Sequence, residues 1–160
     1  GGTINMWTGM RSAREVQEID NPMEDKEPLD VDYVSGAALL IKCSIIQHVG
    51  FLDNDYFMYL EDIDWCYRAK KTGYSVLYVP SSTIWHKVSM STGGEQSPKS
   101  LFFTVRNNIL FMRKHSKSYH WPTYIFFATY HFVRRFLLVG GDKKRSLLHG
   151  IKWNIKDLFH

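Results

Sequence analysis

The strongest constraint in the chain lies in residues 50–86, where three carboxylates occur within four residues: Glu61, Asp62 and Asp64. An apolar and aromatic run, residues 56–60, comes directly before them. A helix that begins near residue 60 would repeat its faces every three to four residues, and Gly73 is a suitable residue to end it. The helix macrodipole favours acidic residues in the first turn. On composition alone, the carboxylates are therefore interpreted as a charged helix N-terminus.

Two features favour a chemical role for the same carboxylates. The apolar run before them would hold them at the rim of a core rather than on a free surface. Three like charges this close together would also raise the pKa of at least one of the groups. A raised pKa is how a carboxylate is tuned to act as a general base near neutral pH. The three carboxylates therefore have two interpretations: a charged helix N-terminus, or a catalytic carboxylate.

The longer pattern resembles a known family. Residues 50–74 read G-F-L-D-N-D-Y-F-M-Y-L-E-D-I-D-W-C-Y-R-A-K-K-T-G-Y, and Y-V-P and a histidine follow them. This order is similar to the second half of family 2 glycosyltransferases of the GT-A fold, in particular the rhamnosyltransferase-like enzymes that build bacterial surface polysaccharides. The match is long and ordered, so it is more specific than a lone E-D dipeptide.

The resemblance implies roles for particular residues. Asp62 would be the catalytic base, and Glu61 would tune or orient it. His86 would contact the divalent metal (magnesium or manganese) and the diphosphate of the donor. Asp64 and Trp65 would position the acceptor, with the indole against a sugar face. The S-G-A segment at residues 35–37 would place Gly36 beside the sugars, although close packing of strands would explain the same glycine.

Three D-x-D tripeptides, at residues 30–32, 53–55 and 62–64, invite a different metal assignment. In the resembled family, the metal-binding D-x-D ends a strand in the first half of the catalytic domain. None of the three follows an apolar strand in that way, so none is interpreted as the donor metal motif. The chain resembles the later half of the enzyme, and we expect the isolated chain to be inactive because the nucleotide-binding half is missing.

Length and composition limit the remaining possibilities. A chain of 160 residues can form one domain with a sizeable core. Its content of 44% hydrophobic and 15% aromatic residues excludes a disordered chain. The two cysteines, Cys43 and Cys66, provide no disulfide framework, so a reducing compartment is expected. The first 14 residues do not resemble a signal peptide. These features indicate a cytoplasmic location, with a peripheral position on the inner face of the cell membrane as an extension.

Local signals predict the elements on either side of the acidic cluster. Residues 1–30 are expected to be mostly loop. Residues 31–41 end in an apolar run suited to a buried strand, and Ser44 would cap a short helix over residues 45–49. Two short strands are expected at residues 74–79 and 83–88. Ser97 as N-cap with Pro98 at the first position predicts a helix to residue 115, in which Arg106 and Asn107 echo an R-N pair of the family with a structural role.

The end of the chain differs in charge from its beginning. Residues 1–98 contain 8 Lys and Arg against 14 Asp and Glu, whereas residues 99–160 contain 12 against 2. Residues 121–139 are rich in aromatic side chains but contain His131, Arg134 and Arg135, so they are not expected to span a membrane. A last helix capped by Asp142 should carry an apolar face, with the following members: Leu147, Leu148, Ile151, Ile155 and Leu158.

Three interpretations of this basic, aromatic-rich end remain open. It could lie on an anionic membrane surface. Its apolar faces could instead pack on each other or on the missing half, leaving a solvated basic face. Binding to single-stranded nucleic acid ranks last because no recognised nucleic-acid motif appears, so no nucleic acid is expected as a partner.

Together these arguments predict an α/β chain with two parts. Residues 1–97 would be the acceptor-side part of a GT-A catalytic domain, and residues 98–160 a helical C-terminal region. The intact enzyme would transfer a hexosyl or rhamnosyl group from a nucleotide-diphosphate donor to a glycan or lipid-linked acceptor in one inverting displacement. The alternative is a non-catalytic module that binds glycan or docks a partner. The sequence does not indicate an oligomeric state.

Overall fold

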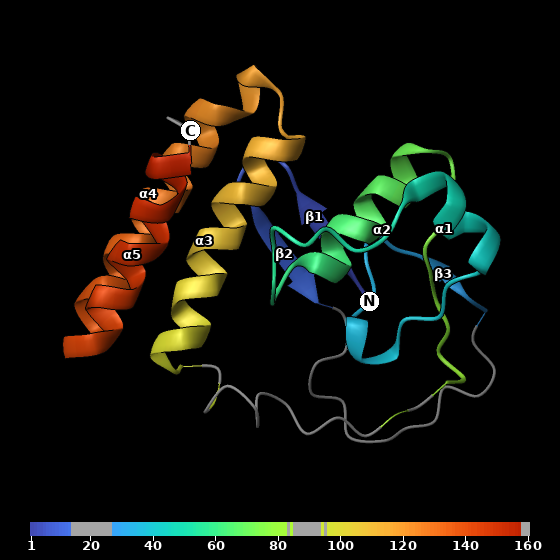
Figure 1. Ribbon diagram of the computed structural model, residues 1–160, viewed down its shortest axis with the longest axis horizontal. Helices are drawn as coiled ribbons and strands as arrows, with labels where there is room; N and C mark the ends of the chain where they lie inside the picture. Colours follow the sequence, from blue (N-terminus) through green and yellow to red (C-terminus); the bar gives the residue numbers. More distant parts are fainter. Residues whose placement is uncertain (14–26, 83, 85–93, 95, 158–160) are drawn as a thin grey trace. The chain divides into compact units, whose positions relative to one another are not determined.

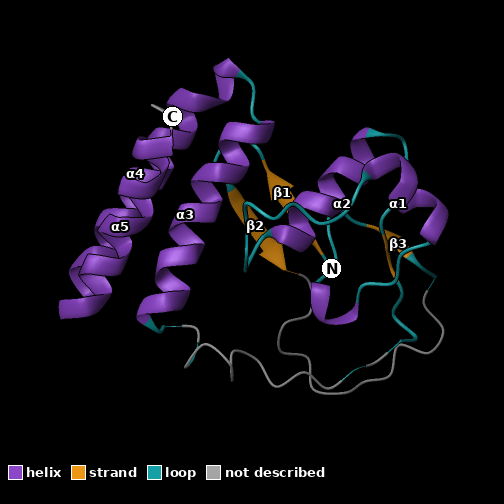
Figure 2. Cartoon of the chain, in the orientation of Figure 1, coloured by secondary structure: helices purple, strands orange, loops and turns teal. Residues whose placement is uncertain are grey.

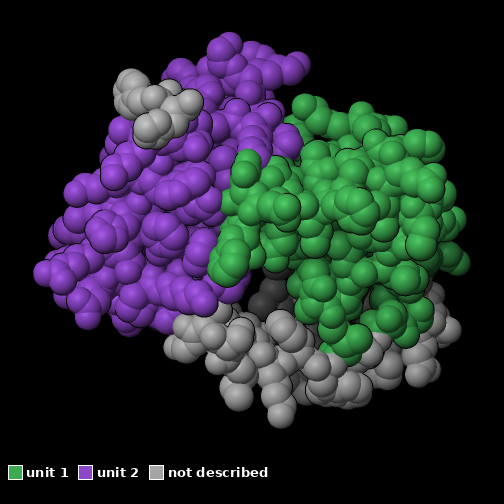
Figure 3. All heavy atoms as spheres, in the orientation of Figure 1, with its two compact units in different colours: residues 1–4, 11–57, 61–86 green, residues 5–10, 58–60, 87–160 purple. Residues whose placement is uncertain are grey.

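The computed structural model describes residues 1–13, 27–82, 84, 94 and 96–157. These residues form two compact units, coloured separately in Figure 3. Unit 1 contains residues 1–4, 11–57 and 61–86, and unit 2 contains residues 5–10, 58–60 and 87–160. The described part of the chain is mixed α/β, with short strands and longer helices (Figure 2). This composition agrees with a partial glycosyltransferase-like domain.

The strands are short and pair in twos (Figure 1). Strand β1 (Gly2–Asn5) pairs with β2 (Met10–Ala13). Strand β3 (Leu29–Asp30) runs antiparallel to β4 (Leu77–Tyr78). The expectation that residues 1–30 are mostly loop was therefore wrong for β1, β2 and β3, and the strand expected at residues 74–79 is reduced to two residues. The strand expected at residues 83–88 lies almost wholly outside the described residues.

Unit 1 is built around helix α2 (Glu61–Lys71), with the shorter helix α1 (Cys43–Val49) beside it. Its core consists of five buried residues: Val31, Trp65, Cys66, Ala69 and Val76. Gly73, at a φ of 92°, follows α2, and its N–H donates to the carbonyl of Lys70, as expected for a helix-ending glycine. The predicted cap at Ser44 was wrong, because α1 already begins at Cys43.

The buried strand predicted for residues 31–41 was also wrong. Residues Gly36–Ala38 instead form a 3₁₀ turn, η1, and the Ser35 hydroxyl accepts a hydrogen bond from the Ala37 N–H. Leu40 is 97% exposed. The apolar run therefore does not continue into a sheet, because the side chain of Ser35 diverts the backbone into a turn.

Unit 2 is dominated by three helices: α3 (Pro98–His115), α4 (Trp121–Leu138) and α5 (Gly141–Asp157). A short 3₁₀ turn, η3 (Ser118–His120), joins α3 to α4. The bounds predicted for α3 are confirmed, and the Ser97 hydroxyl accepts a hydrogen bond from the Ser100 N–H. Helices α3 and α5 run side by side in Figure 1 and make the most extensive helix–helix contact.

Polar groups and a glycine contribute to the packing of α5 against α3, beside the fully buried Leu147 of α5. A Cβ atom added at Gly150 would lie 2.9 Å from the Phe102 carbonyl oxygen, so only glycine allows this approach. Asn154 donates to the Arg106 carbonyl over 2.9 Å, and the Arg106 guanidinium lies 3.7 Å from the centre of the Trp153 ring. The stripe predicted for α5 was wrong in part, because Leu148 and Ile155 are exposed.

Candidate functional site

Helix α2 follows a run of unusual backbone. Phe57, Tyr59 and Leu60 have φ angles of 58°, 67° and 70°, in the left-handed region that residues with a side chain rarely occupy. Each such residue costs about 1–3 kcal/mol and persists only where its surroundings hold it. Backbone strain of this kind gathers at functional sites, and here it lies directly before the Glu61-Asp62 pair.

Helix α3 holds the part of this run that belongs to unit 2. The Asn107 side-chain amide donates to the carbonyls of both Met58 and Tyr59, each over 2.7 Å. The Tyr59 hydroxyl shares a hydrogen bond of 2.9 Å with the Ser100 hydroxyl. Because Asn107 is fully buried, the donor side of its two bonds is shielded from water. The structural role expected for the R-N pair thus has a physical basis at Asn107.

Asp62 and Gly36, predicted as site residues on separate grounds, lie together in unit 1. One carboxylate oxygen of Asp62 accepts the Gly36 N–H over 2.6 Å, and the other accepts the Ile63 N–H over 2.8 Å. A Cβ atom at Gly36 would lie 3.3 Å from the Asp62 Cβ, so glycine leaves little space to spare. Both carboxylate oxygens are therefore fixed in direction. Each keeps a second lone pair that could accept a proton.

Glu61 has an environment that disfavours its charged form. Burial raises the pKa of the Glu61 carboxyl above its ordinary value, and the negative charge of Asp62 raises it further. Among the described residues, the Oε2 atom of Glu61 is buried and has no hydrogen-bond partner. A buried oxygen without a partner is costly unless the carboxyl is protonated or a ligand supplies the bond. The predicted coupling between Glu61 and Asp62 thus has an electrostatic basis.

Asp64 and Trp65 point away from solvent. The Asp64 carboxylate is fully buried, where it accepts hydrogen bonds from the Tyr56 hydroxyl and the Arg68 Nε, over 3.0 and 2.7 Å. The Trp65 ring is part of the core of unit 1, and its Nε1 donates to the Gly50 carbonyl over 2.8 Å. The predicted acceptor-binding role of these two residues does not agree with this burial, because neither presents a surface to a sugar.

Sequence reasoning missed the part played by Arg68. Besides its ion pair with Asp64, its guanidinium donates to the carbonyls of Val49 and Phe51, over 2.6 and 2.9 Å. It therefore ties α2 to the end of α1 and to the loop that follows. The signal was present in the sequence, since Asp64 and Arg68 have the i,i+4 spacing at which opposite charges meet on a helix.

The two aspartates of the first D-x-D tripeptide, Asp30 and Asp32, both form ion pairs with Lys70. The Lys70 ammonium lies 2.6 Å from an Asp30 oxygen and 3.3 Å from an Asp32 oxygen. Partial burial would lower the pKa of Lys70, but the hydrogen bonds to Asp30 and Asp32 outweigh it and raise the pKa. The other Asp32 oxygen accepts the Ile4 N–H over 2.8 Å. Asp32 therefore joins Lys70 of α2 to Ile4 of β1 within unit 1.

The predicted metal contact cannot be placed. His86 lies outside the described residues. Within the described ranges, no group of three or more His, Cys, Asp or Glu side chains is arranged to hold a metal ion. The divalent metal therefore stays a prediction.

Comparison with known proteins identifies relatives of one kind. The chain is 32% identical over 127 residues to N-acetylglucosaminyl-diphospho-decaprenol L-rhamnosyltransferase of two strains of Mycobacterium tuberculosis. This alignment covers 79% of the chain but only 34% of the relative. The chain is also 41% identical over 51 residues to rhamnosyltransferase WbbL of Escherichia coli, covering 32% of the chain and 19% of that protein.

A further relative is archaeal. Low-salt glycan biosynthesis hexosyltransferase Agl10 of Haloferax volcanii is 26% identical over 80 residues, which is 50% of the chain and 26% of that protein. No family model and no solved structure matches the chain. The chain thus spans about a third of the length of the Mycobacterium tuberculosis rhamnosyltransferase. The predicted resemblance to rhamnosyltransferase-like glycosyltransferases is confirmed by these relatives.

Proposed function

Because the chain is similar to glycosyltransferases over most of its length, we propose that it forms the acceptor-side part of a family 2 enzyme with the GT-A fold. The enzyme would transfer a hexosyl group, rhamnose in the first instance, from a nucleotide-diphosphate donor. The relative from Mycobacterium tuberculosis is named for a saccharide linked through diphosphate to decaprenol. A lipid-linked saccharide is therefore the acceptor class that we propose, in cell-surface polysaccharide synthesis.

The proposed reaction is a single displacement with inversion. The acceptor hydroxyl attacks the anomeric carbon of the donor, the bond from that carbon to the diphosphate oxygen breaks, and the nucleoside diphosphate leaves. Asp62 takes the proton from the attacking hydroxyl. A general base of this kind contributes about 10²–10⁴-fold to the rate.

The observation that carries the proposal is the fixed carboxylate of Asp62. Its two oxygens are held by the N–H groups of Gly36 and Ile63, so the base needs no reorganisation before it meets the acceptor. Gly36 lies next to it, at the position proposed for the sugars. Glu61 would act through charge, because its carboxyl adjoins Asp62 in the first turn of α2, where burial first and the negative charge of Asp62 second raise the pKa of Glu61. A divalent metal, if bound at His86, would stabilise the departing diphosphate.

The test uses the full-length protein that contains this chain. Transfer from deoxythymidine-diphosphate-rhamnose to a polyprenyl-diphosphate-linked N-acetylglucosamine is measured for the wild type, for Asp62→Asn and for Asp55→Asn. We expect Asp62→Asn to lose about 10²–10⁴-fold in kcat while the protein stays folded at the assay temperature. Its unfolding temperature should fall modestly, because the asparagine oxygen can accept only one of the two N–H groups that the carboxylate accepts. Asp55→Asn is the matched control, because Asp55 is an exposed carboxylate in the same unit.

Two results would contradict the proposal. Near-wild-type turnover by Asp62→Asn would remove Asp62 from the reaction. Glycan binding by the full-length protein, without transfer from any nucleotide sugar, would indicate the non-catalytic module instead.

A further inference from the structure

Helix α4 exposes an apolar surface that nothing in the described part of the chain covers. Six large apolar or aromatic side chains are each between 48% and 76% exposed: Ile125, Phe126, Tyr130, Val133, Leu137 and Leu138. Four of them, at positions 126, 130, 133 and 137, recur on successive turns of one side of the helix. A contiguous apolar surface of this kind marks a site of interaction. We refer to these six residues as the α4 stripe.

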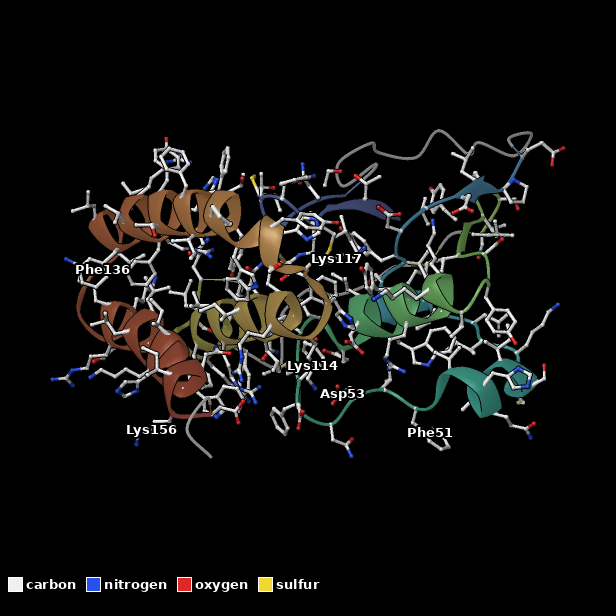
Figure 4. All side chains as sticks on the ribbon, turned by 90° about the horizontal axis from the view of Figure 1, so that it is seen from above. Phe51, Asp53, Lys114, Lys117, Phe136 and Lys156 are labelled. Atoms are coloured by element: carbon white, nitrogen blue, oxygen red, sulfur yellow. The ribbon has the colours of Figure 1, made fainter. Side chains whose placement is uncertain are left out.

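The opposite side of α4 is held by unit 2, so the stripe has a fixed direction. Tyr124 is buried, and its hydroxyl donates to the Asn108 side chain over 2.8 Å. Figure 4 shows the Phe136 ring on the side of α4 that faces α5, with other side chains projecting from the far side of α4. The Lys144 ammonium lies 5.0 Å from the centre of the Phe136 ring. Helix α4 therefore has one side packed within unit 2, and the α4 stripe is exposed on the other side.

Positive charge gathers at the end of the stripe. Five basic residues lie near the C-terminal end of α4 and in the first turns of α5, and we call them the basic turn: Arg134, Arg135, Lys143, Lys144 and Arg145. Asp142 is the one acidic residue within this turn, and its pair with Arg145 is long, at 3.9 Å, and exposed on both sides. No Asp or Glu occurs in residues 96–141. The surroundings of the stripe are thus strongly basic.

The combination of this stripe and this charge identifies the partner. We propose that α4 docks on an anionic lipid bilayer, lying in the plane of the interface with the α4 stripe in the acyl boundary and the basic turn at the headgroups. Aromatic and aliphatic side chains on one face, with Lys and Arg beside them, are what an interfacial helix requires. No helix in the described residues has the length and hydropathy to cross a bilayer.

A second copy of the chain is a less suitable partner. A two-fold interface places the same surface on both subunits, and residues 96–141 contain no Asp or Glu, so a pair formed through α4 would offer no acidic residue of this segment to either basic turn. An anionic leaflet instead attracts each basic residue near it, which raises binding about fivefold per residue. The proposal rests on α4 and its surroundings, and it does not depend on sugar transfer.

The test is cosedimentation of the full-length protein that contains this chain with vesicles of phosphatidylcholine, with and without phosphatidylglycerol, across a salt series. We expect binding to the vesicles that contain phosphatidylglycerol at low salt, and progressive loss as salt shortens the Debye length. Leu137→Gln/Leu138→Gln should weaken binding about 100-fold, because two side chains no longer leave water. Leu40→Gln is the matched control, since Leu40 is 97% exposed in unit 1.

A second pair of variants separates the basic turn from overall charge. Arg134→Glu/Arg145→Glu should weaken binding about 100-fold or more, whereas Lys42→Glu/Lys71→Glu, with the same change in net charge at exposed sites of unit 1, should weaken it far less. Equal loss in both pairs, no binding at low salt, or equal binding to neutral vesicles would overturn the proposal. So would a dimer in sedimentation that Leu137→Gln/Leu138→Gln dissociates, in the absence of vesicle binding.

Discussion

Helices α3 and α4 have the same length and the same proline signal in the first turn, yet α3 buries far more of its residues than α4 does. Each has 18 residues and a proline in its first turn. Helix α3 buries seven residues, three of them the polar Ser100, Arg106 and Asn107, whereas α4 buries only Tyr124. The helix with more apolar and aromatic residues is thus the more exposed one. Burial in unit 2 follows the partners that a helix finds, and the apolar surplus of α4 is available for a partner outside the chain.

The largest expected effect compares a phenylalanine from each helix. Phe111 on α3 is 2% exposed and Phe126 on α4 is 70% exposed. We expect Phe111→Ala to lower the free energy of unfolding by about 3–5 kcal/mol, because it removes a buried ring and leaves a cavity. Phe126→Ala should change it by less than about 0.5 kcal/mol. Urea denaturation of both variants measures the difference, and equal losses would show that α4 is packed inside the protein.

A polar residue gives the second contrast. Asn107→Ala removes both bonds to the part-buried carbonyls of Met58 and Tyr59, so we expect a loss of about 2–3 kcal/mol. Thr129→Ala on the exposed side of α4 should be neutral or slightly stabilising, since alanine is the better helix former. Faster amide exchange near residues 58–60 in Asn107→Ala would locate the effect. Unchanged stability in that variant would mean that the left-handed run is held by other contacts.

The smallest expected effect concerns pH and lies outside both helices. In the folded chain the pKa of Glu61 is raised above the ordinary value of 4.5. Well below pH 4.5, Glu61 is protonated in both the folded and the unfolded state. It then makes no electrostatic contribution to the free energy of unfolding. As the pH rises from 4.5 to the raised value, the unfolded state loses its proton first, so the folded state loses stability. Glu61→Gln should therefore unfold at a higher temperature than the wild type at pH 7, with a difference that shrinks toward pH 4.

Matched thermal melts at pH 4 and pH 7 check this sign. Glu27→Gln serves as the control, since Glu27 is an exposed glutamate in the same unit. If the difference between Glu61→Gln and the wild type were independent of pH, the buried carboxyl would have been assigned the wrong charge state.

The contrast between the helices also shows what could be predicted from sequence. The start of α3 could be predicted because Ser97 and Pro98 act locally: the Ser97 side chain caps the first turn, and Pro98 is the first residue of the helix. The identity of its buried face could not, because Asn107 is buried to bond carbonyls 48 and 49 residues away. Periodicity marks apolar residues as core, and it has no means of marking an amide that a distant segment requires.

The acidic cluster shows the same limit within the candidate site. Its three carboxylates could be found from sequence, together with Gly36. Their different environments could not be predicted. Asp62 accepts the Gly36 N–H, whereas Asp64 accepts hydrogen bonds from Tyr56 and Arg68, and these partners come from other segments or turns. The strand predicted for residues 31–41 failed for a related reason. Apolar content favours a strand there, but a serine hydroxyl and a carboxylate from α2 take the N–H groups that a sheet would need.

Gly150 has a consequence for how α5 can align along α3. It is the one glycine in the interior of α5, and it faces the Phe102 carbonyl at a distance that leaves no room for a methyl group. Sliding α5 by one turn would bring Ser146 or Asn154 to that place, and either side chain would force the helices apart. A single position therefore sets the axial register of the pair. It is the same register that brings Trp153 over Arg106 and Asn154 onto the Arg106 carbonyl.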